Sequence, residues 1–418
     1  MARKRPPQRG RVGWDRAFRG WAAADSPVLA YYVLLGAALA LFVIGLVMVL
    51  SASMITSMKD DGSAYTVFLK QLLYGGIGLV GAALGSRVTV PWWKRLAMPT
   101  LAVAVALQLL VFTSLGATIN GSRNWVHLGS TSLQPSELAK VGLVLTGALI
   151  LTAKRRLMTS IRHVVVPYLL PLVAVTIALV IKGGDLGTTL VLLGIVAAVL
   201  FVAGVPGRFF AGGLGIAAAF AILMAVTSAN RLARISGWVS GSCTDPDGPC
   251  GQAVHGSFAL ADGGWWGVGL GASREKWSWL PEAQNDFIFA IIGEELGLPG
   301  TLITLALFLV LGWACYRIVL RTHDQFVRVA TGGVMAWLLI QATVNIGGVI
   351  GLLPIIGVPL PLVSAGGSAL VTTMLAIGML LSFARHEPGA KDLLSLRPSL
   401  LGRSISVLHI RLRDRPTR

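Results

Sequence analysis

The chain has 418 residues, of which 55% are hydrophobic and only 13% are charged, and its mean hydropathy is +0.74. A soluble domain carries about 25% charged residues, so this composition excludes an ordinary soluble globular protein. The 35 Lys and Arg against 18 Asp and Glu give a net charge of +17. No zinc-finger, RNA-binding or P-loop pattern accompanies that charge, which argues against a nucleic-acid-binding protein.

The basic N-terminal stretch, residues 1–28, predicts a cytoplasmic tail. Its sequence is too long and too broken for the n-region of a signal peptide, and no cleavage site follows the first apolar run. We therefore expect an uncleaved first span. The polar and basic residues 386–418 predict a second cytoplasmic tail, which leaves 29–385 as the membrane domain.

Apolar runs of about 20 residues recur along the chain, and each is long enough to cross a hydrocarbon core about 30 Å thick. The sequence therefore predicts an all-α polytopic membrane protein with about ten transmembrane helices. The predicted spans are 29–51, 66–86, 92–114, 136–153, 164–182, 187–204, 208–227, 286–317, 326–350 and 363–384. In the eighth span, the GLPG at 297–300 predicts a bend or an interruption.

Basic residues mark one side of the predicted membrane domain. They lie between alternate spans, on the side of the N-terminal tail: Arg87, Lys94, Arg95, Lys154, Arg155, Arg156, Arg162, Arg208, Arg317, Arg321 and Arg328. The positive-inside rule makes this side cytoplasmic, and an even number of spans puts both termini there. The connections at 52–65, 115–135, 228–285 and 351–362 are then expected outside the cytoplasm.

The connection 228–285, between spans seven and eight, is the largest and is rich in Gly and Trp. Long loops are often functional, but composition alone favours a membrane-surface loop whose Trp side chains lie in the interfacial belt. Cys243 and Cys250 can form a disulfide there if the loop is outside the cytoplasm. Two Cys and a nearby His255 do not make a metal site, and Cys315 is expected to be inert packing.

Four acids surround the start of the eighth span, namely Glu282, Asp286, Glu294 and Glu295. Asp286 opens it, and composition alone favours Asp286 or Asn285 as the helix cap. Glu294 and Glu295 lie roughly 12 Å further along the helix and are turned roughly 80° and 180° from Asp286, so they form no catalytic dyad with it. We expect them to be paired structural acids rather than functional ones, with Lys140 or Lys182 as candidate partners.

Glycines continue the face of the eighth span that carries Asp286. Gly293 and Gly297 are spaced as a GxxxG pair, which suits the close approach of another helix.

The start of the fourth span predicts a second polar cluster. Pro135 suits the first helical position and Glu137 the third, after Gln134. Lys140 lies one turn below Glu137 on nearly the same face. One alternative is a Glu137–Lys140 pair that serves packing only. The other is an anion site that also uses Arg123, because free N–H groups at a helix N-terminus attract anions.

Several stretches resemble the signatures of the SEDS family, which comprises FtsW, RodA and SpoVE. They are NWVHLGSTSLQPSELAK (124–140), GDLGTT (184–189), LPEAQNDFIFAIIGEELGLPG (280–300) and GLLPIIGVPLPLVSAGGSA (351–369). The resemblance covers about 29–388, and the acidic stretch, SAGGSA and ARHEP are most similar to the actinobacterial FtsW branch. The chain departs from the family with GGDLGT, where members often have PDLGT, and with VSAGGSA, where many have ISYGGSS.

The resemblance implies a peptidoglycan glycosyltransferase that polymerises lipid II at the outer face of the cytoplasmic membrane. It releases undecaprenyl diphosphate and works with a class B penicillin-binding protein and other divisome membrane proteins in septal cell-wall synthesis. Such a transfer needs a base for the acceptor hydroxyl and cations for the leaving diphosphate. The family motif makes Asp286 the catalytic residue, which we assign as that base.

The remaining expected site residues contact substrate. Arg123 and Lys140 are assigned to binding of the diphosphate, and Glu282 to orientation of the substrate. Glu137 and Gln134 are assigned to substrate binding beside Lys140. Asp185 is expected to cap a helix first and contact the site second. Ser364 is expected in a tight, non-helical entry into span ten. Four basic residues of the large loop are expected to be mostly solvated, with phosphate or glycan binding as the alternative: Arg231, Arg234, Arg274 and Lys276.

Two other functions stay open at this point. A lipid II flippase or another transporter would also have ten spans and intramembrane charges, and a non-catalytic divisome scaffold would need no acid at position 286. The sequence requires no cofactor, and assistance by a divalent cation is left open because no ligand cluster demands it.

Overall fold

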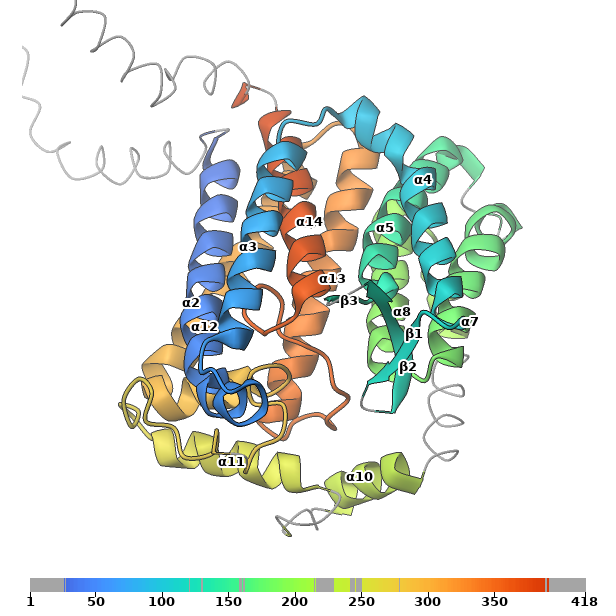
Figure 1. Ribbon diagram of the computed structural model, residues 1–418. Helices are drawn as coiled ribbons and strands as arrows, with labels where there is room; N and C mark the ends of the chain where they lie inside the picture. Colours follow the sequence, from blue (N-terminus) through green and yellow to red (C-terminus); the bar gives the residue numbers. More distant parts are fainter. Residues whose placement is uncertain are drawn as a thin grey trace, which may run out of the picture.

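The computed structural model describes Ser26 and residues 28–390, except for 120, 129–130, 158–159, 161, 214, 216–228, 241–244, 246–249, 278 and 388. The described chain is mostly helical (Figure 1) and has eight helices long and apolar enough to cross a membrane. They are α2 (Leu29–Asp61), α3 (Thr66–Gly85), α5 (Pro135–Ala153), the α6–α7 segment (Arg162–Lys182), α8 (Leu186–Ala203), α12 (Ile288–Arg321), α13 (Gln325–Val349) and α14 (Gly367–Arg385).

Two of the ten predicted spans fall outside these eight. The third corresponds to α4 (Val90–Leu110), which packs against α5 but is not counted among the eight apolar helices. The seventh, 208–227, lies outside the described residues except for 208–213 and 215. The helical membrane class is thus confirmed, and the total of ten spans stays a prediction.

The first helix is longer than predicted. We expected a span over 29–51 and a loop over 52–65, but α2 continues to Asp61 and ends at Gly62, whose φ is 71°. Polar residues after Val49 lowered the local hydropathy. Ser51, Ser53 and Ser57 are nevertheless buried; Ser51 donates to Glu295 of α12, and Ser57 accepts from Val67 N of α3.

Two membrane segments depart from regular α-helix. The segment 162–182 contains a π-helical stretch, Val165–Ala174, with Pro171 inside it, and proline removes a backbone donor and disturbs the regular ladder. In α12 the backbone turns at Gly297, whose φ is 64°. The predicted interruption at GLPG is therefore confirmed.

The connections at one end of the bundle are themselves folded. Residues 116–133 form a small antiparallel sheet of β1 (Gly116–Ile119), β2 (Ser122–Leu128) and β3 (Thr131–Leu133), in the order β1-β2-β3. The predicted loop 228–285 contains α10 (Ala229–Ser240) and α11 (Gly251–Gly263). Both helices lie across the lower end of the bundle in Figure 1, and we call this end the loop end.

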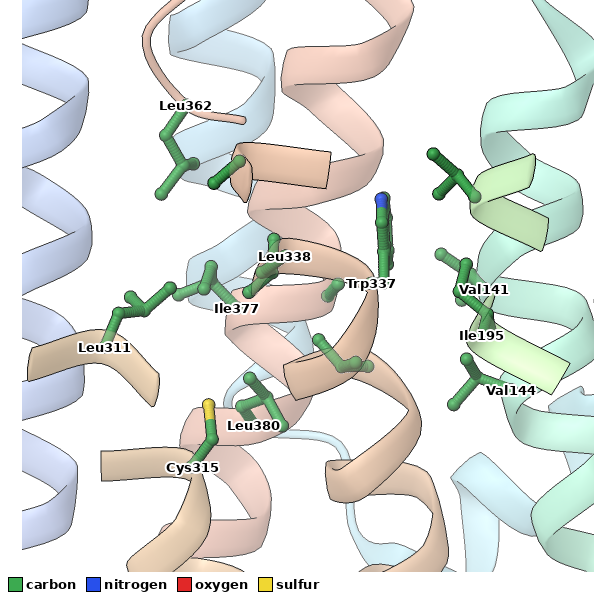
Figure 2. Packing of buried hydrophobic residues seen from close by; sticks show 14 of the residues in the cluster. Val141, Val144, Ile195, Leu311, Cys315, Trp337, Leu338, Leu362, Ile377 and Leu380 are labelled. Atoms are coloured by element: carbon green, nitrogen blue, oxygen red, sulfur yellow. The ribbon is translucent and has the colours of Figure 1, made fainter. Parts of the chain in front are cut away.

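Helix α13 is at the centre of the packed core. In Figure 2, Trp337 and Leu338 of α13 lie between two groups of apolar side chains. One group comes from α5 and α8, and the other from α12 and α14: Val141, Val144 and Ile195 in the first, and Leu311, Cys315, Ile377 and Leu380 in the second. All are buried. Cys315 is free and buried, as expected for inert packing.

Between α13 and α14 the chain re-enters the bundle without forming a helix. We call residues 350–366 the re-entrant loop; its residues 360–364 are buried, and α14 begins only at Gly367. The loop packs closely on α2, because a Cβ at Gly45 would lie 2.7 Å from backbone atoms of Leu362 and Val363. Irregular backbone at this depth is tolerated where protein surrounds it. The expected non-helical entry into the last span is confirmed.

Candidate functional site

Asp286 does not cap α12. The helix begins at Ile288, and its N-cap residue is Phe287, with no side-chain cap hydrogen bond. The cap role that composition favoured for Asp286 or Asn285 is therefore wrong. Residues before the helix form turns instead, in which the N–H groups of Asn285 and Phe287 donate to the carbonyl of Glu282 at 2.9 and 3.3 Å. These turns leave the Asp286 carboxylate outside the helix.

Three successive carbonyls of this segment accept hydrogen bonds from elsewhere in the chain. Ala365 N donates to Gln284 O at 2.9 Å, and Ser364 Oγ donates to Asn285 O at 2.6 Å. Asn345 Nδ2 of α13 donates to Asp286 O at 2.7 Å. The segment that carries Asp286 is thus fixed to the re-entrant loop and to α13.

Asp286 lines a pocket between the start of α12, the end of α13 and the re-entrant loop. The other lining residues are Phe287, Val344, Asn345, Gly348, Val349, Ile355, Ile356, Gly357 and Val358. The carboxylate lies next to Gly357, because a Cβ added there would be 3.4 Å from Asp286 Oδ2. Most of the pocket wall is apolar, so an ionised carboxylate in it is poorly solvated.

The electrostatics of the pocket favour a proton on Asp286. Burial raises the pKa of Asp286 from an ordinary 3.8 to about 7, and the negative charges of Glu282 and Asp185 act in the same direction. Among the described residues, none donates a hydrogen bond to this carboxylate. A carboxyl group with a pKa near neutrality can both accept and release a proton under physiological conditions.

The structure brings two further predicted acids near Asp286. Glu282 has a φ of 59°, and its carboxylate accepts a hydrogen bond from Asn285 Nδ2. Asp185 caps α8 by accepting from Thr188 N at 2.8 Å, which confirms its expected cap role. Gln134 Nε2 also donates to Asp185 Oδ2, at 3.0 Å. Gln134 and Asp185 therefore lie together at the starts of α5 and α8.

Glu137 and Lys140 form a buried ion pair. Lys140 Nζ is 2.7 Å from Glu137 Oε1 and also donates to Gln341 Oε1 at 3.0 Å. It lies 5.2 Å from the centre of the Trp337 ring. These contacts are those of the packing-pair alternative, and the diphosphate role of Lys140 stays a prediction.

Arg123 differs from this buried pair in its exposure and in its partners. It is exposed on β2, and its guanidinium donates to Val111 O at 3.1 Å and to Thr113 O at 3.0 Å. Arg123 and Lys140 have no hydrogen-bond partner in common among the described residues. The expected diphosphate role of Arg123 also stays a prediction.

Glu294 and Glu295 form a separate buried cluster with loop residues 271–276. Glu294 accepts from Ser273 Oγ and from Arg274 N, both at 2.6 Å. Glu295 is 3.0 Å from Lys276 Nζ and accepts from Ser51 Oγ at 2.6 Å. The partner is therefore Lys276, which the sequence analysis expected to be solvated. The candidate partners Lys140 and Lys182 are wrong, since Lys140 pairs with Glu137 and Lys182 Nζ lies over the Phe112 ring.

The predicted glycine seam is confirmed. A Cβ at Gly293 would lie 2.4 Å from Leu260 of α11, and one at Gly297 would lie 2.4 Å from Gly267 N. At the end of α11, a Cβ at Gly263 would be 2.0 Å from Gly293 O. Small residues thus let α11 and the following turn approach α12 at backbone distance.

The remaining residues of the large loop are described in part. Cys250 is disulfide-bonded, whereas Cys243 lies outside the described residues, as do the side chains of Arg231 and Arg234. His255 Nδ1 is 2.8 Å from Glu275 Oε2. Within the described ranges, no group of three or more His, Cys, Asp or Glu residues is arranged to hold a metal ion.

Sequence reasoning missed Asn345 and Gln341. Both are polar residues in an apolar span, and their spacing of four places them on one face of α13. That pattern was the available signal, because an amide inside a membrane helix needs a hydrogen-bond partner.

Comparison with known proteins places the chain among bacterial relatives. Residues 32–388 match the FtsW, RodA and SpoVE family model, described as "Cell cycle protein". A "Probable peptidoglycan glycosyltransferase FtsW" of Mycobacterium tuberculosis is 41% identical over 87% of this chain and 69% of its own length. "Stage V sporulation protein E" of Bacillus subtilis is 35% identical over 84% of this chain and 95% of its own.

Solved structures of related proteins also match this chain. One described as "Structural coordination of polymerization and crosslinking by a peptidoglycan synthase complex" matches with a TM-score of 0.69 and 28% identity, over 85% of this chain and 97% of its own. The rod shape determining protein RodA of Thermus thermophilus matches with a TM-score of 0.61 and 26% identity, over 85% of this chain and 96% of its own.

Proposed function

The chain belongs to the FtsW, RodA and SpoVE family of bacterial membrane proteins, and we propose that it is a peptidoglycan glycosyltransferase. It polymerises lipid II into glycan strands and releases undecaprenyl diphosphate. The support is the activity named for relatives such as the mycobacterial protein, together with a match over most of both chains. The FtsW proteins of two mycobacteria, which are actinobacteria, are 41% identical to this chain over 87% of its length.

The observation that carries the proposal is the position of Asp286. Its carboxylate is outside the helix, in a pocket at the loop end, with a pKa raised to about 7. As general base it takes the proton of the acceptor sugar hydroxyl. That oxygen attacks the anomeric carbon, a glycosidic C–O bond forms, and the bond from this carbon to the diphosphate breaks. The leaving diphosphate takes the bonding electron pair, and inversion at the anomeric carbon is the family-level expectation.

The leaving diphosphate needs positive charge or free N–H groups. Arg123 is exposed on β2, where a lipid headgroup can reach it. Lys140 lies in the second turn of α5, whose N-terminal N–H groups also attract anions. Direct contact by Lys140 requires its Nζ to exchange Gln341 for a phosphate oxygen. Five further residues are proposed to surround the sugars or to position Asp286, Arg123 and Lys140: Glu282, Glu137, Gln134, Asp185 and Ser364.

The expected setting is the cytoplasmic membrane, with the loop end outside and both termini in the cytoplasm. The basic connections, such as that between α3 and α4, lie at the opposite end from α10 and α11, which agrees with the positive-inside rule. A class B penicillin-binding protein is the proposed partner, since a structural relative belongs to a synthase complex that coordinates polymerization and crosslinking. The septum is the proposed location by similarity to FtsW.

One reconstitution tests the function against its rivals. The protein is purified with its cognate class B penicillin-binding protein, supplied with lipid II, and assayed for glycan polymer. We expect polymer from the wild type and none from Asp286→Ala. Lipid II flipping without polymer from the wild type would instead identify a transporter. Unchanged cell division with Asp286→Ala, in the absence of polymer from either protein, would identify a scaffold.

A further inference from the structure

We propose that Asn345 is a positioning residue for Asp286, whose amide holds the backbone of the base and the facing wall of the pocket in one fixed arrangement. The inference rests on the proposed role of Asp286 as the base. It concerns a residue on α13 that does not itself touch the reacting atoms.

The contacts of Asn345 are specific. The residue is 6% exposed, and its Nδ2 donates at 2.7 Å both to Asp286 O and to Val358 O. A side-chain amide NH2 has two N–H bonds, and both are used here. The opposite amide orientation would place Oδ1 against two carbonyl oxygens, so the two acceptors determine which atom is the nitrogen.

A second amide on the same helix face supports this arrangement. Gln341 lies one turn from Asn345, and its Nε2 donates to Pro359 O at 2.8 Å. Its Oε1 accepts from Trp337 Nε1 at 2.7 Å and from Lys140 Nζ at 3.0 Å, which fixes the amide orientation. Trp337 lies in the middle of the packed core (Figure 2). Helix α13, which is packed in the core, thus holds two successive carbonyls of the re-entrant loop, those of Val358 and Pro359.

Asn345 connects the two sides of the pocket. One of its N–H bonds holds the residue that carries the base. The other holds Val358, which follows Gly357, the residue beside the Asp286 carboxylate. Loss of the amide removes both bonds at once and leaves two buried carbonyls without this donor. The carboxylate and the facing wall are then free to separate.

The rest of the segment is held independently of Asn345. Gln284 O keeps its bond from Ala365 N, and Asn285 O keeps its bond from Ser364 Oγ. The local fold should therefore survive substitution of Asn345, and the effect should fall on the position of Asp286. A misplacement of about 1 Å in a reacting geometry lowers rates by about 100-fold.

The test compares Asn345→Leu and Asn345→Asp, which remove the amide N–H donors, with Thr343→Val, an exposed matched control on the same helix. Lipid II polymerisation is measured with the intact chain and its penicillin-binding partner. We expect kcat to fall by about 100-fold in both Asn345 variants, with KM for lipid II near the wild-type value. Thr343→Val should match the wild type.

The pH profile separates positioning from a merely structural role. The charged groups that act on Asp286 are Glu282 and Asp185, and both are retained in Asn345→Leu. If Asp286 moves out of its pocket, the acid limb of the kcat profile should shift to lower pH, because the carboxyl becomes better solvated. A loss of folded protein would lower the rate at every pH and leave the limb where it was.

Several outcomes would overturn the inference. These are a wild-type kcat in Asn345→Leu, a rise in KM with kcat unchanged, or an unshifted acid limb in folded protein. If Asn345→Leu does not fold, Asn345→Ala removes the same donors without added bulk and is judged by the same criteria. Asp286→Asn is assayed in parallel. Full activity of Asp286→Asn would refute the proposed base. If Asp286→Asn is inactive but the Asn345 variants have wild-type activity, this inference alone is refuted.

Discussion

Two acidic sites lie along α12 and the turns before it, and they differ in how their carboxylates are satisfied. Glu294 and Glu295 are fully buried inside the helix, yet each accepts several hydrogen bonds, and Glu295 is paired with Lys276. Asp286 lies outside the helix at a pocket, and no described residue donates a hydrogen bond to its carboxylate. Burial alone therefore does not distinguish the two sites, whereas the hydrogen bonds to their carboxylates do.

The cost of burying each acid is met differently in the two sites. In the Glu294–Glu295 cluster, the lysine and the backbone N–H groups of 273–275 offset the loss of water around the charges. At Asp286 the same loss is not offset, so it appears as a raised pKa. The first arrangement stabilises a packed structure, and the second leaves a group available for proton transfer.

Asp286→Asn should produce the largest effect on activity. The amide keeps the shape of the side chain but cannot take a proton, so the polymerisation rate should fall by about 100-fold to 10,000-fold. Asp262→Asn, which neutralises an exposed acid on α11, is the matched control and should retain activity. A similar loss in both variants would mean that net charge at the loop end, and not a base, is what the assay detects.

Lys276→Met should produce the largest effect on stability. It leaves Glu295 buried without its cation, which destabilises a protein by about 3–5 kcal/mol, measurable as a lower unfolding temperature in detergent. Lys94→Met is the control, because the Lys94–Asp324 pair is 2.8 Å long but 36% and 39% exposed and should contribute about 1 kcal/mol or less.

The double variant Lys276→Met/Glu295→Gln sharpens this test. It removes both charges of the pair together and should recover much of the lost stability. A double variant as unstable as the single one would show that Lys276 acts through its other contacts, with Ser51 and Gly271.

The polymerisation rate should rise with pH through about 7. A base acts when deprotonated, and the pKa of Asp286 is raised from 3.8 to about 7. The free energy of unfolding should change with pH in the opposite direction to the rate. Between these two values the folded protein holds a proton that the unfolded chain has lost, so stability should fall as pH rises across that window. Asp286→Asn should remove this part of the fall, and an acid limb near pH 4 in the wild-type rate would contradict the raised pKa.

Glu294→Gln should produce the smallest effect. The amide oxygen can still accept one hydrogen bond, from Ser273 or from Arg274, so stability should fall by about 1–3 kcal/mol while polymerisation stays near the wild-type rate. Thermal unfolding and the lipid II assay measure the two quantities separately. Loss of activity in a stable Glu294→Gln protein would abolish the distinction between the two acidic sites.

The sequence predicted the fold where local pattern determines it. Apolar runs gave the helical spans, GLPG gave the break at Gly297, and the GxxxG spacing gave the contact with α11. It failed at the end of α2, because Ser51 is polar but is buried and hydrogen-bonded to Glu295 of α12. It also missed the small sheet at 116–133, since short strands leave little periodic signal.

The site was predictable only in part, for a different physical reason. The separation of Asp286 from Glu294 and Glu295 was predicted correctly, although the helical rise and rotation used for it do not extend to Asp286, because α12 begins only at Ile288. Partners are not local: Lys276 and Glu295 are 19 residues apart, and Asn345 and Asp286 are 59 apart. The helix cap that composition alone favoured for Asp286 or Asn285 is wrong, since the chain before Ile288 forms turns whose carbonyls at Gln284, Asn285 and Asp286 accept three tertiary hydrogen bonds.

The break at Gly297 has a consequence for how the protein enters the membrane. A regular helix satisfies its own backbone, but here Val268 N and Gly269 N donate to the carbonyls of Glu294 and Glu295, and Leu298 N donates to Gly264 O. The part of α12 nearest the loop end therefore lacks a complete set of internal hydrogen bonds. Residues 264–269 leave the ribosome before α12, so insertion and docking of these two segments must be coupled. Bulky substitutions at Gly267 should thus be assembly defects, removed by quality-control proteolysis before any glycan is made.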